Sequence, residues 1–210
     1  FPFRPPLEPA TPPLPAIEPL ARPTVEMTRG VMMPTDAQVT TVVEAVNTYE
    51  RGLIICGPNC PGGAFPSALA ALAEASGYPI LADPLSGVRF GEVAATGLIC
   101  GGYESYLRGG HAPWSAPEVV IRFGAVPTSK WLNSYLTNHP PQQLIHIRDN
   151  GIWADDLHLV THFLQADATA TCEAVTAQLS VRRHTPWIAR ILSVEASSQA
   201  IVQQYCAEHF

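Results

Sequence analysis

The sequence feature that most limits the fold of this chain is a series of short, almost wholly apolar runs, each four or five residues long. Strands buried on both faces of a parallel sheet have this pattern, because neither face meets water. Segments with helical spacing alternate with the runs, which is typical of a doubly wound sheet. We therefore predict an α/β fold with a doubly wound, mostly parallel sheet of Rossmann type. The predicted strands are 53–56, 79–82, 119–123, 144–147 and 161–164.

Segments with apolar residues three and four positions apart predict the helices of this fold. Thr35 offers an N-cap for the first helix, and Gly77 ends the second. Either Thr128 or Ser129 can cap the helix that starts at Lys130. Residues 96–108 also favour a helix, although two glycines interrupt them. The predicted helices are 37–50, 65–76, 96–108, 130–138 and 168–180, followed by a helical tail from residue 185.

The distribution of proline divides the chain. Nine of its 21 prolines lie in residues 1–23, a density that excludes helix and central strand and indicates an extended linker. We predict a Pro-rich interdomain linker over 1–34, a central α/β domain over 35–182, and a helical tail over 183–210 that leads to a next domain. The chain starts at Phe1 without a methionine, and we expect it to be a piece of a longer protein.

Composition excludes several classes of function. The net charge is −6 and no basic patch stands out, so nucleic acid is not a predicted partner. No apolar run reaches the ~18 residues of a membrane span, and the first residues lack a signal-peptide pattern. The five cysteines predict free thiols in a reducing cytoplasm. The pair Cys56 and Cys60 has no second pair of ligands nearby, so we predict no zinc site.

Most loops lack a recognisable chemical motif. The loop 57–63 misplaces the glycines of a dinucleotide fingerprint and contains two prolines that lack amide hydrogens, so we predict no dinucleotide there. His158 and His162 have the spacing of a helical metal pair, but the residues between them favour strand. We therefore predict a surface turn and strand. A solvated turn is predicted for the acidic residues Asp149, Asp155 and Asp156.

The loop 124–130 is the best candidate for a binding site. It follows a predicted buried strand and starts a predicted helix, and ligands collect at the carboxyl ends of strands in such sheets. Helix amides together with Lys130 would favour an anionic group. The alternative is a capped helix whose lysine has no role beyond solvation, and the residues alone leave both interpretations open.

Four blocks then resemble a known family in order: residues 51–58 (RGLIICGP), 78–87 (YPILADPLSG), 102–108 (GYESYLR) and 117–130 (PEVVIRFGAVPTSK). They resemble the middle domain of the 2-succinyl-5-enolpyruvyl-6-hydroxy-3-cyclohexene-1-carboxylate synthase family, whose members depend on thiamine diphosphate. The opening residues 3–9 resemble the stretch where that family leaves its first domain. The resemblance covers roughly residues 1–180.

The resemblance implies a three-domain transferase of menaquinone or phylloquinone biosynthesis. Its first domain binds the cofactor's pyrimidine, and its third holds the diphosphate through Mg²⁺ in a Gly-Asp-Gly motif. The enzyme decarboxylates 2-oxoglutarate and adds the succinyl unit to isochorismate. This chain contains no Gly-Asp-Gly. We therefore expect the fragment by itself to be inactive, without catalytic, cofactor-binding or metal-binding residues. Its expected partners are the missing N- and C-terminal domains, in a homodimer or homotetramer.

The resemblance also carries one residue over to this chain, Lys130, and we predict substrate binding by Lys130 and its neighbour Ser129. It implies that Lys130 supplies a point charge for a substrate carboxylate. Some family members carry a second basic residue where this chain has Trp131, so the chain departs from their pattern at that position. An alternative function is a stand-alone Rossmann-type binding module for an anionic metabolite, held by Lys130, Arg122 or Arg89.

Overall fold

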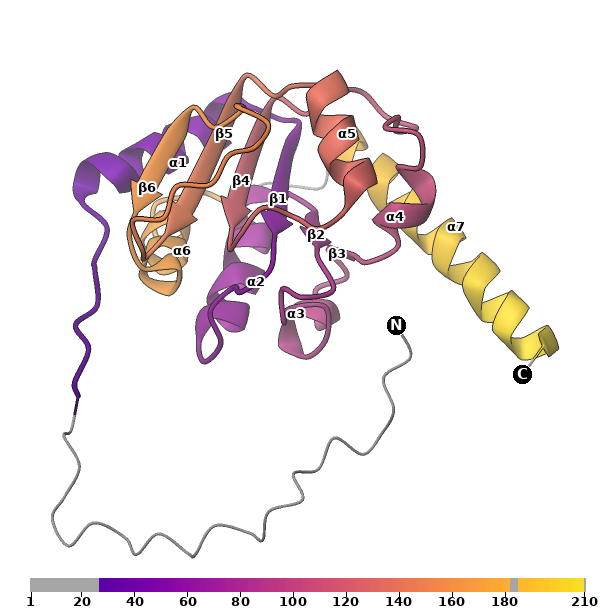
Figure 1. The fold of residues 1–210 in the computed structure, drawn as a ribbon, viewed down its shortest axis with the longest axis horizontal. Helices are drawn as coiled ribbons and strands as arrows, with labels where there is room; N and C mark the ends of the chain where they lie inside the picture. The colour runs from indigo at the N-terminus through magenta and orange to yellow at the C-terminus, as the bar shows by residue number, and fades with distance from the viewer. Residues whose placement is uncertain (1–26, 182–184, 210) are drawn as a thin grey trace, which may run out of the picture. The chain divides into compact units, whose positions relative to one another are not determined.

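A computed structural model describes residues 27–181 and 185–209 of the chain. Within the unit that starts at Val31, six parallel strands form one sheet (Figure 1). Its order is β3-β2-β1-β4-β5-β6, the order of a doubly wound sheet, and it confirms the predicted fold class. The strands are β1 Gly52–Cys56, β2 Ile80–Ala82, β3 Ile99–Cys100, β4 Val119–Phe123, β5 Gln143–Arg148 and β6 His162–Gln165.

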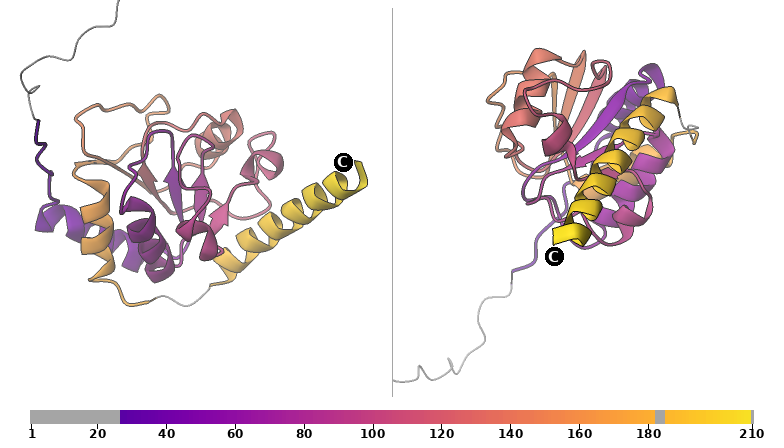
Figure 2. Two further views of the ribbon diagram at one scale, coloured as in Figure 1. Left: turned by 90° about the horizontal axis from the view of Figure 1, so that it is seen from below. Right: turned by 90° about the vertical axis from the view of Figure 1, so that its right-hand side faces the viewer.

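Helices cover both faces of the sheet, and none among the described residues is long and apolar enough to cross a membrane. One face packs against α1, α2 and α6, and the other against α4, α5 and α7 (Figure 2). The helices are α1 Asp36–Thr48, α2 Phe65–Ser76, α3 Glu92–Ala95, α4 Tyr103–Tyr106, α5 Lys130–Asn138, α6 Ala168–Thr176 and α7 Pro186–His209.

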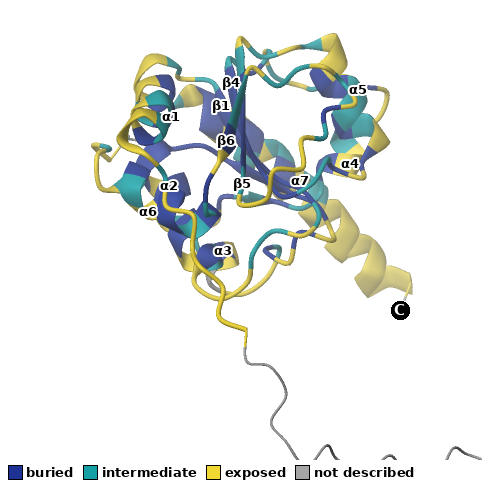
Figure 3. Ribbon diagram, turned by 60° about the vertical axis from the view of Figure 1, so that its left-hand side comes forward, coloured by how far each residue is buried: buried dark blue, intermediate teal, exposed yellow. Residues whose placement is uncertain are grey.

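Alternation along the central strands produces two hydrophobic layers. Ile54 and Ile121 point to the first face, whereas Leu53 and Val120 point to the second. All five residues of β1 and of β4 are buried, as expected for strands covered on both sides. Figure 3 shows this buried sheet between helices whose outer surfaces are exposed.

Local signals explain where the helices begin and end. Thr35 caps α1 in a capping box with Gln38, so two backbone amides that would otherwise lack a partner are satisfied. Gly77 ends α2 in the left-handed conformation with φ of 68°, which glycine adopts without strain. Ser129, rather than Thr128, caps α5. The predicted bounds of α2 and α5 are confirmed to the residue.

Two predicted helices are wrong in part. Within 96–108, Ile99 and Cys100 form the edge strand β3, because they pair with Ile80 and Leu81 of β2. Only the short α4 of this stretch is helical. The helix predicted over 168–180 ends at Thr176. The four-residue α3 was not predicted, since a single turn carries no apolar period.

The first half of α7 packs on the domain. Trp187 is buried and its indole Nε1 donates a hydrogen bond of 3.1 Å to the Gly52 carbonyl. The Glu195 carboxylate accepts hydrogen bonds from the amides of Gly101 and Gly102 and from the Tyr106 hydroxyl, at 2.7–3.1 Å. The end of α7 is exposed. Most of the predicted linker 1–34 lies outside the described residues, and the predicted division of the chain into 1–34, 35–182 and 183–210 stays a prediction.

Candidate functional site

The loops after β1 and β4 meet at the carboxyl edge of the sheet, where the chain order reverses and where ligands bind in doubly wound folds. The two loops are joined by their backbones. The Ala125 amide donates to the Pro58 carbonyl at 2.7 Å, and the Gly57 amide donates to the Phe123 carbonyl at 2.9 Å. This switch point is therefore a candidate site by its position in the fold.

Close packing leaves little room at the switch point. A Cβ atom on Gly57 would lie 1.9 Å from the Ala125 carbonyl oxygen, so only glycine fits there. Beside these loops lies a cavity of about 80 Å³, lined by Asn59, Gly124 and Arg148 among others. Sites for cofactor-sized ligands are clefts of roughly 300–1,000 Å³. The cavity beside the switch point is therefore smaller than such a cleft.

A buried carboxylate, that of Asp83, contacts the candidate loop 124–130 near its end. Asp83 directly follows β2, and its residue exposure is 1%. Its Oδ2 accepts hydrogen bonds from the Thr128 amide at 2.8 Å and from the Thr128 hydroxyl at 2.7 Å. Its Oδ1 accepts from the Leu85 amide at 2.9 Å. The Thr128 amide next to the start of α5 is therefore paired with a carboxylate of the protein itself.

The two predicted site residues, Ser129 and Lys130, differ in their surroundings. Ser129 is buried, and its Oγ accepts a hydrogen bond of 3.0 Å from the Leu132 amide. Lys130 is exposed, and its Nζ lies 5.2 Å from the centroid of the Trp131 ring. Ser129 thus forms the helix cap, while Lys130 presents a positive charge at the surface near the carboxyl edge. Their predicted role in substrate binding stays a prediction.

A second polar cluster lies beneath the 149–161 connection. Arg122 is buried, and its Nη2 lies 3.0 Å from His146 Nδ1 and donates to the Ala154 carbonyl at 2.9 Å. His146 Nε2 lies 2.8 Å from the Gly124 carbonyl. Arginine can only donate and a carbonyl can only accept, so His146 is the neutral tautomer with its proton on Nε2. Burial and then the Arg122 charge lower the pKa of His146 to about 4.

The prediction of a solvated acidic turn is confirmed for Asp149 and Asp156, which are exposed, but wrong for Asp155. Asp155 is buried, and its Oδ2 accepts from the Val160 amide at 2.8 Å. Burial lowers the pKa of Arg122, and the Asp155 charge opposes this effect. Asp155 is buried because the 149–161 connection, which contains no helix, lies over Arg122. Its negative charge there opposes the cost of burying the Arg122 guanidinium. His158 lies in an exposed turn and His162 begins β6, as predicted.

Arg122 and Arg89, two of the residues predicted to hold an anionic metabolite in the alternative function, differ in their surroundings. Arg122 is committed to the buried cluster, and Arg89 donates from Nε to the Ala82 carbonyl at 2.8 Å. Sequence reasoning missed Asp83, Arg122 and His146 as structural groups of this edge. The available signal was a charged or polar residue within, or directly after, an apolar run.

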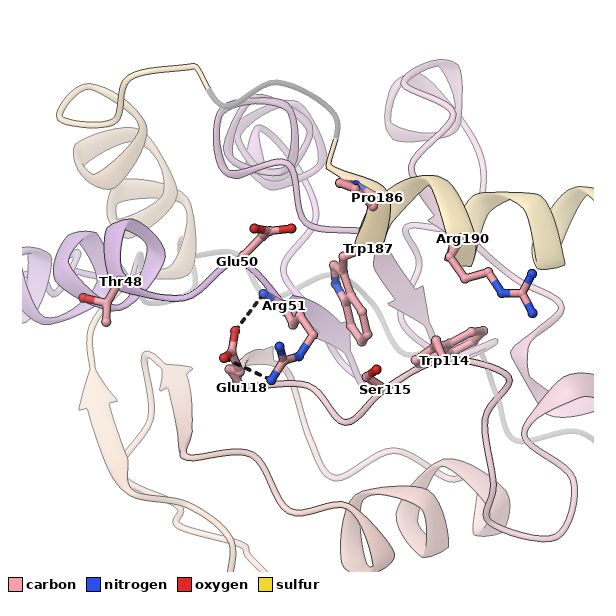
Figure 4. A pocket seen from close by; sticks show the side chains of 9 residues that line it. All are labelled: Thr48, Glu50, Arg51, Trp114, Ser115, Glu118, Pro186, Trp187 and Arg190. Carbon is pink, nitrogen blue, oxygen red and sulfur yellow. Dashed lines mark hydrogen bonds and ion pairs between the residues drawn. The ribbon is translucent and has the colours of Figure 1, made fainter.

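A larger cavity of about 510 Å³ lies at the opposite, amino edge of the sheet (Figure 4). Two of its polar residues, Arg51 and Glu118, are paired with each other, as the dashed lines show. Arg51 Nη2 lies 3.0 Å from Glu118 Oε1, and Arg190 Nε donates to the Pro113 carbonyl at 3.2 Å. Arg51 and Glu118 directly precede β1 and β4, and Trp187 and Arg190 belong to the first turns of α7. We therefore interpret this cavity as the space between the amino edge of the sheet and the start of α7.

The thiols and the metal-binding side chains add no further site. Cys56, Cys100 and Cys172 are buried, Cys60 is half-buried and Cys206 is exposed, and all five are free. Across 27–181 and 185–209, no three His, Cys, Asp or Glu side chains gather in a way that could hold a metal ion.

Comparison with known proteins identifies relatives of the whole chain. The sequence model of the family described as "Middle domain of thiamine pyrophosphate" matches residues 32–210. The chain is 43% identical, over 217 residues, to the 2-succinyl-5-enolpyruvyl-6-hydroxy-3-cyclohexene-1-carboxylate synthase of Roseiflexus castenholzii. That match covers 99% of this chain and 36% of the relative. The synthase of the same name from Haloquadratum walsbyi is 36% identical, over 93% of this chain and 33% of the relative.

A solved structure has the same fold. It belongs to an enzyme from Mycobacterium smegmatis described as thiamin diphosphate-dependent, with a TM-score of 0.52 and 16% sequence identity. The match covers 78% of this chain and 31% of that one. This chain therefore spans about a third of the length of the relatives that it matches.

Proposed function

Since the chain belongs to the family of thiamine pyrophosphate enzyme middle domains, we propose that it is the central domain of a 2-succinyl-5-enolpyruvyl-6-hydroxy-3-cyclohexene-1-carboxylate synthase. The observation that carries this proposal is 43% identity over 99% of the chain. The complete enzyme decarboxylates 2-oxoglutarate and adds the succinyl unit to isochorismate, in the cytoplasm, on the way to menaquinone or phylloquinone. Thiamine diphosphate, held with Mg²⁺, supplies the electron sink for the loss of carbon dioxide.

The role of this domain is structural and substrate-lining. Its switch point has no room for the cofactor, and the chain has no Gly-Asp-Gly, so the cofactor site belongs to other domains of the enzyme. Those domains are the proposed partners, in a homodimer or homotetramer. Exposed apolar side chains support this arrangement, since other domains would remove them from water. They include Phe90, 84% exposed, and Ile201, Val202 and Tyr205 at the end of α7.

The first prediction concerns the cofactor. Thiamine diphosphate titrated with Mg²⁺ into residues 1–210 is expected to give no binding heat, because the chain lacks the Gly-Asp-Gly motif and its switch point lacks the space for the cofactor. The full-length protein is expected to bind it in the same calorimeter. Binding by residues 1–210 alone would contradict the proposed location of the cofactor and place a cofactor site within this domain.

The second prediction concerns Lys130, the one lysine of the chain. In the full-length enzyme, Lys130→Met is expected to raise the KM of either isochorismate or 2-oxoglutarate about tenfold, because one charge-assisted contact to a carboxylate contributes about 1.4 kcal/mol. The kcat should stay within about twofold, because the charge binds substrate and transition state alike.

Steady-state kinetics with each substrate in turn tests this prediction. The matched control is Arg108→Met, which removes an exposed positive charge elsewhere on the domain and should leave both KM values unchanged. If Lys130→Met behaves like this control, Lys130 does not bind substrate, and the substrate-lining part of the proposal is wrong.

A further inference from the structure

Asp83 makes an unusual set of contacts for a residue after a strand. It directly follows β2, yet its Oδ2 reaches Thr128 in the loop after β4, across the intervening strand β1. The residue is 1% exposed and accepts hydrogen bonds from the Thr128 amide, the Thr128 hydroxyl and the Leu85 amide, at 2.7–2.9 Å. A buried carboxylate with three donors is firmly held, and so are the groups that it binds.

The loop that precedes Lys130 is anchored along its length. Its start is fixed by the contact of His146 with the Gly124 carbonyl and by the bond from the Ala125 amide to Pro58. Asn133 Nδ2 donates to the Pro127 carbonyl at 3.0 Å. Thr128 is the last residue before Lys130 that is bound by a residue outside both the loop and α5, and that residue is Asp83. Lys130 lies two positions after Thr128. The position of Lys130 therefore depends on Asp83.

An asparagine could not replace this aspartate without loss. Both oxygens of Asp83 accept hydrogen bonds, Oδ1 from Leu85 and Oδ2 from Thr128. An amide side chain has one accepting oxygen and an NH₂ group that only donates, so one set of donors would face another donor. The negative charge also interacts favourably with the N-terminal end of the nine-residue α5. The position thus requires a carboxylate.

We propose that Asp83 is a positioning residue of the enzyme, which holds Thr128 and thereby places Lys130 to meet a substrate carboxylate. This inference rests on the proposed function, in which Lys130 binds substrate. Asp83 itself does not touch the substrate. Its effect is transmitted through one residue, Thr128, whose amide and hydroxyl are both bound to the same carboxylate oxygen.

The test compares variants of the full-length enzyme. Asp83→Asn and Thr128→Val each remove part of the anchor, and each is expected to raise the KM of the substrate that responds to Lys130→Met, by about fivefold, while kcat changes less than about twofold. Thr128→Ser keeps the hydroxyl and is expected to retain the original KM. In the double variant Asp83→Asn with Lys130→Met, the KM should match that of Lys130→Met alone, because both changes remove one interaction.

The matched control is Glu195→Gln. Glu195 is another buried carboxylate that accepts bonds from two backbone amides and a hydroxyl, but it holds α7. The substitution Glu195→Gln is expected to lower the melting temperature of the enzyme without changing the KM of either substrate. If Lys130→Met raises the KM while Asp83→Asn and Thr128→Val lower only the melting temperature, the positioning role is overturned and the proposed function stands. If Lys130→Met itself leaves both KM values unchanged, the role of Lys130 fails and this inference fails with it. Should Asp83→Asn not fold, Thr128→Val decides the outcome alone.

Discussion

Replacing Gly57 with alanine is expected to lower the free energy of unfolding by about 3 kcal/mol or more. The new Cβ would lie 1.9 Å from the carbonyl oxygen of Ala125 and 2.9 Å from its carbonyl carbon. Both are backbone atoms, so no side chain can rotate away to relieve the contact. The loops after β1 and β4 would have to separate, which would break the hydrogen bond from Ala125 to Pro58 and disturb the loop that leads to Lys130.

Urea unfolding followed by circular dichroism measures this effect. Gly62→Ala is the matched control, because Gly62 is exposed in the same loop and an added Cβ there would meet no described neighbouring atom within 4 Å. It is expected to change the free energy of unfolding by less than about 0.5 kcal/mol. Equal midpoints for the two variants would mean that the loops are not in contact as described, and that the switch point is open.

Acidification is expected to destabilise the domain through His146. Burial and then the Arg122 charge lower its pKa in the folded state to about 4, from an ordinary value of 6.5. Between these two pH values the unfolded chain binds a proton that the folded chain does not, so stability falls as the pH falls. The contribution of His146 is fully present above pH 6.5 and is lost progressively towards pH 4. The full contribution of His146 to the free energy of unfolding is about 3 kcal/mol.

The measurement is the free energy of unfolding as a function of pH, between about 7 and 4, for the original protein and for His146→Gln. The variant cannot titrate at this position, so its stability should fall less steeply over this range, although it starts from a lower value. His111→Gln changes an exposed imidazole and should keep the original slope. Parallel curves for the original protein and His146→Gln would contradict a buried neutral histidine.

Residues adjacent in the chain account for what could be predicted. The runs that became β1 and β4 are apolar because they are covered on both sides, and this requirement is visible without knowledge of their neighbours. Ser129 caps α5 through a bond to Leu132, and Gly77 ends α2 through its own backbone conformation. Such interactions join residues that are close together in the sequence, so the local sequence is enough to predict them. The family resemblance also depended on continuous segments of sequence, such as residues 51–58 and 117–130.

The predictions that were wrong concern residues whose structure depends on partners far away in the chain. The strand at Ile99 and Cys100 exists because β2 offers it an edge, and a two-residue strand has no pattern of its own. Asp155 is buried because the 149–161 connection lies over Arg122, which the sequence around Asp155 does not indicate. Arg122 and His146 face one another because β4 and β5 are paired in register.

The sequence by itself therefore determined the class of fold, most helix limits and the family, since these depend on local periodicity, caps and ordered blocks. Only the tertiary structure decided that the switch point is closed and that Asp83 holds the loop before Lys130. Asp83 and Thr128 are 45 residues apart, and a strand lies between their own two strands. Their contact depends on strand order, and strand order follows from the packing of the whole sheet rather than from any one segment.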